Sequence, residues 1–246
     1  MDFLTSACCN TAPVQAEYTP IGQTCTDDTS GMTYYIVGDK ESRRGIVFCY
    51  DIFGFHPNAY QVADILGLEG LRVIVPDYLE GKPLTLAELK QPEVFHDFKT
   101  RRGTYAYCQP MTLAAVNILR TEGCEQIGGV GFCWGAKLVM GALAEKGKSG
   151  VASGALLHPS FLEMADFEQA QGPILLLLSK DEPDFQNEFA VAKAQPFGGD
   201  SRMERFSKQV HGFCGARGDF GNDDVTGDVD KALAMTARFF KRTLAA

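Results

Sequence analysis

Long apolar runs are missing from this sequence, although hydrophobic residues make up 45% of its 246 positions. A helix that spans a bilayer needs about 20 consecutive apolar residues. Residues 1–13 also lack the basic start and the apolar stretch of a secretory signal. We therefore expect a protein without a membrane anchor, whose apolar residues form an ordinary globular core.

Clusters of basic residues are missing as well. The chain has 23 Lys and Arg residues against 31 Asp and Glu residues, which gives a formal net charge of −8. Nucleic acids and anionic membranes bind basic surfaces, so neither is an expected partner. The expected partner is a small molecule, and the composition leaves open whether the chain is a monomer or a homodimer.

Metal-binding spacings are the third absence. The chain has eight cysteines but no C-x-x-C pair, and its four histidines are dispersed. We therefore expect no metal site. A chain of this length does not need disulfides as staples, so we expect reduced thiols and a cytoplasmic location. Cys8 and Cys9 fall in an irregular leader that we expect to cover residues 1–30.

Strand-like and helix-like segments alternate along the rest of the chain, without internal repeats or a low-complexity linker. Near-continuous apolar strands separated by helices indicate a mostly parallel, doubly wound α/β sheet with helices on both faces. We expect one domain over residues 1–246, with a cap-like insertion near 79–110. The expected strands are 33–37, 45–50, 71–76, 126–132, 151–157, 173–179 and a weaker one at 202–206; the expected helices are 59–67, 113–121, 134–146 and 230–243.

The segment Gly131-Phe132-Cys133-Trp134-Gly135 has the G-x-C-x-G pattern of a nucleophile elbow, with a thiol where most elbows carry a hydroxyl. It stands between an expected buried strand and an expected helix. This context places the sulfur on a tight turn near a helix N-terminus, which favours the thiolate. Taken alone, the motif is equally compatible with a buried structural cysteine in a strand–helix turn.

Partners for this thiol follow later strands, in the order nucleophile, acid, histidine. His211 follows the strand at 202–206 and is the candidate general base. The strand at 173–179 is followed by Asp181, Glu182 and Asp184, any of which can orient an imidazole. The residues favour Asp181 or Glu182 without choosing between them.

Two other strand ends carry candidate residues. The backbone N–H groups of Ile52 and Trp134 are the expected oxyanion hole. Asp51, at the end of a buried strand, is either a turn-stabilising carboxylate or part of the site. His158, after the strand at 151–157, has either a structural role or a place in the pocket wall, while His56 and His96 are less well placed.

Taken together, these segments resemble the dienelactone hydrolase family of α/β-hydrolases. The resemblance is carried by the segments Asp51-Ile52-Phe53-Gly54-Phe55, Val75-Pro76-Asp77-Tyr78, Gly81-Lys82-Pro83, Gly131-Phe132-Cys133-Trp134-Gly135 and His211-Gly212-Phe213. The leader, with Cys8-Cys9 and Tyr18-Thr19-Pro20-Ile21-Gly22, is similar to the eukaryotic-type branch.

The resemblance implies a triad of Cys133, His211 and the acid at 181–182, and hydrolysis of a lactone or an activated ester without a cofactor. It also implies that Asp51, standing where the family usually has Glu, contacts the resting nucleophile. An ungapped register from Pro173 favours Glu182 as the acid, whereas residue type favours Asp181. Arg217 is the candidate for the family's substrate-binding arginine, with Arg101 and Arg102 as alternatives.

A thiolate is itself a good leaving group, so its tetrahedral adduct reverts unless the substrate carries a comparably good one. This favours enol esters and lactones over amides and simple alkyl esters. The expected function is a cysteine-dependent lactone or carboxylic ester hydrolase. The alternatives are an acyltransferase or a thiol-based detoxifying protein on the same scaffold, and a catalytically inactive binding module.

Overall fold

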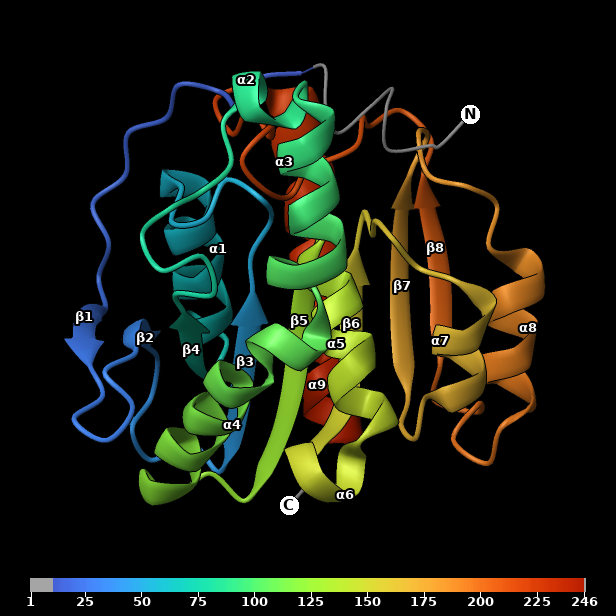
Figure 1. Ribbon diagram of the computed structural model, residues 1–246. Helices are drawn as coiled ribbons and strands as arrows, with labels where there is room; N and C mark the ends of the chain where they lie inside the picture. The colour runs from blue at the N-terminus through green and yellow to red at the C-terminus, as the bar shows by residue number, and fades with distance from the viewer. Residues whose placement is uncertain (1–10, 246) are drawn as a thin grey trace.

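The computed structural model describes residues 11–245, and within them all eight strands form one sheet in the order β1-β2-β4-β3-β5-β6-β7-β8 (Figure 1). Strands β3 to β8 are parallel to one another, while β2 runs antiparallel to both β1 and β4. The strands are β1 (Gln23–Thr26), β2 (Thr33–Val37), β3 (Arg44–Cys49), β4 (Arg72–Pro76), β5 (Gln126–Phe132), β6 (Val151–Leu157), β7 (Ile174–Ser179) and β8 (Arg202–Phe206).

Helices cover both faces of this sheet, as expected for a doubly wound α/β fold. One face carries α4 (Tyr105–Thr121), α5 (Gly135–Ala144), α7 (Met164–Gln169) and α8 (Gln186–Ala194), and the other carries α1 (Pro57–Leu68) and α9 (Asp223–Thr243). Four short segments complete the described chain: α2 (Leu86–Leu89), α3 (Pro92–Asp97), the π-helix η2 (Phe98–Arg102) and α6 (Lys146–Ser149). The expected α/β-hydrolase architecture is thus confirmed.

The central strands are buried along nearly their whole length, which explains their continuous apolar sequences. Every residue of β4 and β7 is buried, as is usual for parallel strands covered on both faces. The predicted strands 33–37, 126–132, 151–157 and 202–206 are confirmed without change. Those predicted at 71–76 and 173–179 begin one residue later, and the one predicted at 45–50 lies one residue earlier, at 44–49.

Several expectations about local structure are wrong. Residues 23–26, placed in an irregular leader, form β1, which pairs with β2 along the edge of the sheet. Helix α4 begins at Tyr105 rather than near 113, and Pro110 lies inside it. The Thr104 hydroxyl caps its N-terminus by accepting from the N–H of Tyr107 at 3.3 Å. The helix expected at 230–243 is α9, which begins seven residues earlier, at Asp223. The helices α7 and α8 were not expected from the sequence. Cys8 and Cys9 lie outside the described residues.

The region near 79–110 contains short helices rather than an irregular loop. It holds α2, α3 and η2 and ends in the first turn of α4. In Figure 1, α2 lies at the end of the molecule where the parallel strands terminate, and α3 runs from there down the front toward α4. Within residues 11–245, no helix is long and apolar enough to cross a membrane.

Helix α9 packs its apolar face on the sheet near β6 and β7. Leu233, Ala237 and Phe240 are buried, as their spacing predicts. Asn222 caps the helix by accepting a hydrogen bond from the N–H of Asp224 at 3.0 Å. Two acidic residues in its first turn and two basic residues in its last turn match the helix dipole.

Candidate active site

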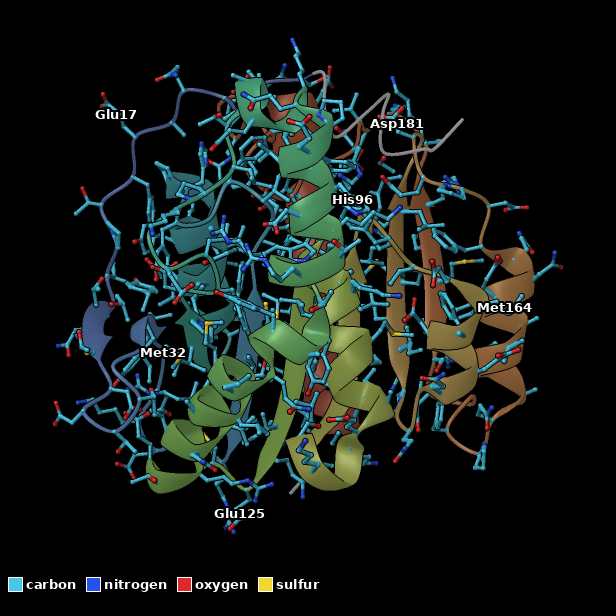
Figure 2. The ribbon with its side chains drawn as sticks, in the orientation of Figure 1. Glu17, Met32, His96, Glu125, Met164 and Asp181 are labelled. Carbon is cyan, nitrogen blue, oxygen red and sulfur yellow. The ribbon has the colours of Figure 1, made fainter. Side chains whose placement is uncertain are left out.

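The residues of the expected site gather at the carboxyl ends of β3, β5, β6, β7 and β8, where open α/β sheets bind ligands. Figure 2 shows the polarity of the sheet: Asp181, after β7, and Glu125, before β5, lie at opposite ends of the molecule. The candidate groups come from five separate loops, so their proximity is a property of the sheet and not of the sequence.

Cys133 occupies the turn between β5 and α5, with a backbone φ of 53°. A positive φ is uncommon for a residue with a side chain, and such strain clusters at functional sites. The turn requires glycine on both sides: a Cβ at Gly135 would overlap the carbonyl oxygen of Cys49, and one at Gly131 would meet the carbonyl oxygen of Gly135. Cys133 is 3% exposed. The geometry is that of a nucleophile elbow.

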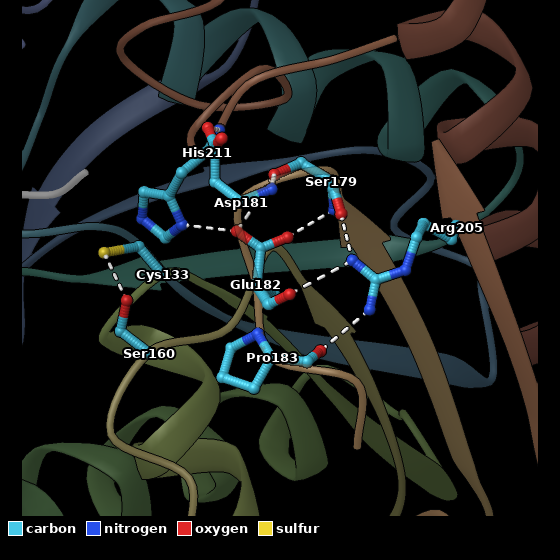
Figure 3. A network of polar contacts seen from close by, with 8 residues as sticks. All are labelled: Cys133, Ser160, Ser179, Asp181, Glu182, Pro183, Arg205 and His211. Carbon is cyan, nitrogen blue, oxygen red and sulfur yellow. Dashed lines mark hydrogen bonds and ion pairs between the residues drawn. The ribbon is translucent and has the colours of Figure 1, made fainter. Parts of the chain in front are cut away.

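The imidazole of His211 lies against Glu182, whose Oε1 is 2.7 Å from Nδ1 (Figure 3). Both side chains are buried. The Ser179 hydroxyl donates to Glu182 Oε1 at 3.0 Å, and the Ser179 N–H donates to Oε2. These bonds fix the carboxylate, so that it can hold one tautomer of the imidazole and stabilise its charged form.

Asp181 has a different position, although it is adjacent to Glu182. Its Oδ2 accepts a hydrogen bond from the backbone N–H of His211 at 2.8 Å, so it fixes the main chain of the histidine rather than its ring. Asp184 is exposed. Of the three candidate acids, Glu182 is the one whose carboxylate reaches Nδ1 of His211.

Arg205, on β8, holds the loop that presents Glu182. Its guanidinium donates to the carbonyl oxygens of Ser179, Glu182 and Pro183 at 2.5, 3.1 and 2.8 Å. Three carbonyls that would otherwise need other donors are thereby bound to one side chain. Neither Arg205 nor Ser179 was singled out from the sequence, because nothing in their local pattern distinguishes them from ordinary strand residues.

Asp51 ties two loops of the site together. Its Oδ1 accepts from the N–H of Phe53 at 2.9 Å, and its Oδ2 accepts from the N–H of Ala216 at 3.0 Å, in the segment that follows His211. Nearby, the amide of Asn58 donates to the carbonyl oxygens of Gly215 and Gly218 at 2.9 and 2.8 Å. Burial raises the pKa of the Asp51 carboxyl above its usual range. These contacts agree with the turn-stabilising alternative, and a contact with the resting thiol remains a prediction.

The backbone N–H groups of Ile52 and Trp134 stand at the ends of β3 and β5, on either side of the elbow. Within residues 11–245, neither N–H donates a hydrogen bond to the protein. Buried backbone donors are rarely left without acceptors. The two groups are therefore available to an oxygen atom of a bound molecule.

Trp134 also connects the elbow to a cavity of about 190 Å³. Its indole N–H donates to the carbonyl oxygen of Gly103 at 2.7 Å, which joins the elbow to the end of the π-helix η2. The cavity is lined by Phe98, Lys99, Gly103, Thr104, Tyr105, Trp134, Lys137, Phe161 and Glu163. Its aromatic walls and polar rim suit a small, partly apolar molecule.

The three candidate arginines lie in different settings. Arg217 is buried, donates through Nε to the carbonyl oxygen of Thr11 at 2.7 Å, and stacks over the Phe53 ring at 5.3 Å. Arg101 is exposed and paired with Asp97 at 2.7 Å. Arg102 donates weakly to the carbonyl oxygens of Leu79 and Lys82 at 3.3 and 3.4 Å. Of the three, Arg217 is the one on the loop that carries His211.

The other three histidines lie in three different places, and one of them contacts His211. His56 is the N-cap of α1, where Nδ1 accepts from the N–H of Asn58 at 3.2 Å, and His96 is exposed on α3. His158 is fully buried, and its ring packs edge-on against that of His211 with centroids 5.2 Å apart. Within residues 11–245, its two ring nitrogens have no hydrogen-bond partner. Burial lowers the pKa of His158 well below its usual value, so this imidazole is neutral.

Ser160 is a neighbour of the elbow that the sequence analysis missed. Its hydroxyl oxygen lies 3.4 Å from Sγ of Cys133. Its position two residues after His158, at the carboxyl end of a parallel strand, was the available signal. Within residues 11–245, no cluster of three or more His, Cys, Asp or Glu side chains is arranged to hold a metal ion.

Three buried cysteines outside the elbow have raised pKa values. Burial raises the pKa of Cys49 to about 12 and that of Cys124 to about 11, and it raises the pKa of Cys214 well above its usual value. These thiols are protonated at neutral pH, so they react slowly with electrophiles. Faster reaction of Cys133 than of these three thiols with an electrophile at neutral pH would therefore indicate an activated thiolate at Cys133.

The sheet order, the elbow and the acid and histidine on the following loops define an α/β-hydrolase. The model of the Dienelactone hydrolase family matches residues 32–244, and the chain belongs to that family. It is a dienelactone hydrolase-like hydrolase.

Curated relatives agree with this assignment. The chain is 32% identical to an uncharacterised AIM2 family protein of Schizosaccharomyces pombe, over 96% of this chain and 98% of that one. It is 25% identical to "Dienlactone hydrolase 1" of Gibberella moniliformis, over 74% and 73% of the two chains. These fungal relatives agree with the eukaryotic-type branch of the family.

Solved structures support the fold. A dienelactone hydrolase-like promiscuous phosphotriesterase from metagenomic libraries superposes with a TM-score of 0.67 at 18% identity, over 92% of this chain and 99% of that one. A dienelactone hydrolase from Anabaena variabilis gives a TM-score of 0.62 at 15% identity, over 91% and 99%. At these identities the similarity establishes the architecture and leaves the substrate open.

Proposed function

We propose that this protein is a cysteine-dependent hydrolase of lactones or activated carboxylic esters, with Cys133 as nucleophile, His211 as general base and Glu182 as the acid of the triad. The observation that carries the proposal is the buried pair of Glu182 and His211, 2.7 Å apart, at the end of the sheet that also carries the Cys133 elbow. In the close-up of Figure 3, the imidazole stands between the Glu182 carboxylate and the Cys133 sulfur.

In the proposed reaction, His211 takes the thiol proton and the thiolate attacks the acyl carbon, forming a C–S bond. The backbone N–H groups of Ile52 and Trp134 stabilise the resulting oxyanion. When the adduct collapses, the bond to the leaving oxygen breaks and this oxygen takes the proton from His211. A thioester remains, and in a lactone the leaving oxygen stays attached to the same acyl chain.

Water completes the cycle. His211 takes a proton from the water as its oxygen attacks the thioester carbon. The C–S bond then breaks, the departing sulfur takes this proton from His211, and the carboxylic acid leaves, which restores the thiol for the next substrate. Glu182 stabilises the imidazolium in both halves of the reaction. No step needs a metal or a redox cofactor.

The substrate preference follows from the leaving-group ability of the thiolate. The adduct expels whichever group leaves more easily, so a poor alkoxide or an amine returns the free substrate. Enol esters, lactones of enols and phenyl esters carry leaving groups comparable with a thiolate. The cavity bordered by Trp134 and Phe161 can hold the acyl portion of such a molecule. The name of the human relative, a carboxymethylenebutenolidase homolog with 22% identity, fits this class.

The test compares the native chain with Cys133→Ala on activated phenyl esters and enol lactones. The expected result is turnover by the native chain and loss of nearly all of it in the variant. Cys214→Ala, which removes another buried thiol, is the matched control and should keep activity. Equal turnover by Cys133→Ala would contradict the proposal.

Product analysis with competing alcohol and thiol acceptors tests the acyltransferase alternative. Hydrolysis in water as the main outcome supports the proposal, while preferential acyl transfer would overturn it in favour of a transferase. A Cys133 thiol no more reactive at neutral pH than Cys49 or Cys124 would instead favour an inactive binding module.

A further inference from the structure

The loop from His158 to Phe161, between β6 and α7, contacts two of the side chains assigned to the triad. Ser160 lies 3.4 Å from the Cys133 sulfur, and His158 packs against the His211 ring. His158 and Phe161 have backbone φ values of 38° and 65°. Two non-glycine residues with positive φ within four positions cost free energy, and such strain persists only where the surrounding structure enforces it.

Backbone hydrogen bonds join this loop to the elbow. The N–H of Cys133 donates to the carbonyl oxygen of Leu157 at 3.1 Å, and the N–H of Ser160 donates to the carbonyl oxygen of Cys133 at 2.9 Å. The first bond extends the pairing of β5 with β6. The second bond joins the loop after β6 to Cys133 again, through the carbonyl group of Cys133. The position of Ser160 relative to Cys133 is therefore fixed by the main chain.

In this position the side chain of Ser160 contacts the Cys133 sulfur. It is 1% exposed, and its Oγ lies within hydrogen-bond distance of Sγ (Figure 3). A hydroxyl can donate and accept, whereas a thiolate can only accept. Once Cys133 loses its proton, the Ser160 hydroxyl is therefore the donor in this contact. Hydrogen bonds to charged groups are stronger than neutral ones.

We propose that Ser160 is a positioning residue for the nucleophile: its hydroxyl donates a hydrogen bond to the Cys133 thiolate and holds the resting sulfur in place. This inference rests on the proposed function, because it assigns Cys133 as the nucleophile. It differs from the expectation that Asp51 contacts the resting thiol. Both Asp51 oxygens accept from backbone N–H groups, whereas Ser160 has a direct contact with the sulfur.

Titratable and charged groups on the elements around the sulfur also influence its proton. They are Asp51 after β3, His158 in the loop itself, Glu182 after β7, and His211 and Arg217 after β8. Ser160 does not titrate at ordinary pH. Its removal therefore changes the hydrogen bonding of the sulfur without changing the charge of the site, which makes the substitution a clean probe.

The experiment measures the rate of iodoacetamide alkylation at Cys133 against pH, in the full-length chain, with the modified peptide quantified by mass spectrometry. Ser160→Ala and Ser160→Gly remove the hydroxyl in two ways, and Ser160→Thr keeps it. The expected result is a rise of about one pH unit in the alkylation midpoint for Ala and Gly, equal to a tenfold loss of thiolate below the midpoint. Ser160→Thr should keep the native midpoint.

Ser149→Ala is the matched control. Ser149 is a buried serine whose hydroxyl donates to the carbonyl oxygen of Ala142 at 2.6 Å, away from the elbow, so its loss should leave the midpoint unchanged. Steady-state kinetics should show a lower kcat for Ser160→Ala with little change in KM, because the contact concerns the nucleophile and not the substrate.

Two results would overturn the proposal. One is an unchanged midpoint in whichever hydroxyl-free variant folds, as judged by thermal denaturation. The other is an equal shift in Ser160→Thr, which would attribute the change to packing. Either result leaves the hydrolase proposal standing, since that depends on the activity of Cys133→Ala.

Discussion

At the scale of single residues, the neighbouring carboxylates Asp181 and Glu182 have different contacts. The Glu182 carboxylate lies beside the His211 ring and takes two hydrogen bonds from Ser179. The Asp181 carboxylate bonds the main chain of the same histidine. One orients the imidazole and the other fixes the backbone that carries it, so their substitutions should have different consequences.

We predict that Glu182→Gln lowers kcat for an activated phenyl ester by about 10²–10⁴-fold, because a neutral amide cannot stabilise the imidazolium. Asp181→Asn retains an oxygen that can accept the N–H of His211, so kcat should stay within a few-fold of the native value. Steady-state kinetics at saturating substrate measure both. A larger loss in Asp181→Asn than in Glu182→Gln would show that the assignment of the acid is wrong.

The sequence predicted part of this residue-scale picture. The pattern around Cys133 and the position of His211 after a strand were sufficient to select both residues. The sequence could not select the acid. The ungapped register favoured Glu182 and the residue type favoured Asp181, and the carboxylates of both residues can orient an imidazole. The contact made by Ser160 could not be foreseen, since it joins residues 27 positions apart through the pairing of β5 with β6.

At the scale of elements, loops that follow neighbouring parallel strands form the site. Arg205 fastens the loop after β7 to β8 through three carbonyl oxygens. Asp51 and Asn58 fasten the loop after β8 to the region after β3. The loop after β6 carries the buried, neutral His158 into the same place. These connections make the geometry of the site depend on several strands at once.

We predict that His158 makes the protein sensitive to acid. Burial depresses the pKa of His158 in the folded state, so the unfolded chain binds this proton more readily below its ordinary pKa of about 6.5. The neutral imidazole of His158 therefore contributes its full stability to the fold above pH 6.5. As the pH falls below 6.5, the free energy of unfolding decreases by up to about 1.4 kcal/mol per pH unit. Urea denaturation of the native chain and of His158→Gln between pH 5 and 7 measures it.

The difference in unfolding free energy between native chain and variant should shrink toward pH 5 by about 2 kcal/mol. Groups shared by the two proteins cancel in this comparison. His96→Gln, a change at an exposed histidine, is the control and should leave the pH dependence unaltered. Parallel curves for the native chain and His158→Gln would contradict the prediction.

At the scale of the whole molecule, one sheet covered by helices on both faces carries the loops of the site (Figure 1). Helix α9 covers the part of its face of the sheet that α1 does not cover. Phe240 of α9 is fully buried beside Gly128 of β5. A Cβ at Gly128 would meet the Phe240 ring, so the small residue makes room for the large one. This packing lies toward the end of the sheet opposite to the site.

We predict that Phe240→Ala lowers the free energy of unfolding by about 3–5 kcal/mol, from the loss of apolar burial and the cavity left behind. The activity per folded molecule should change little, because the residue is remote from the site loops. Arg238→Ala, an exposed substitution in the same helix, should change stability by less than about 0.5 kcal/mol. Chemical denaturation measures both, and similar losses in the two variants would contradict the prediction.

Hydrophobic periodicity and glycine placement in the sequence determined the fold class, the central strands and the elbow, because these depend on neighbouring residues. The edge strand β1 and the helices α7 and α8 were not predicted, because their local sequence patterns are weak and tertiary packing stabilises them. Only the tertiary structure decided that Glu182 faces His211 and that Ser160 lies on Cys133. The physical reason is that these contacts join separate loops, whose relative positions are set by the sheet and by Arg205, Asp51 and Asn58.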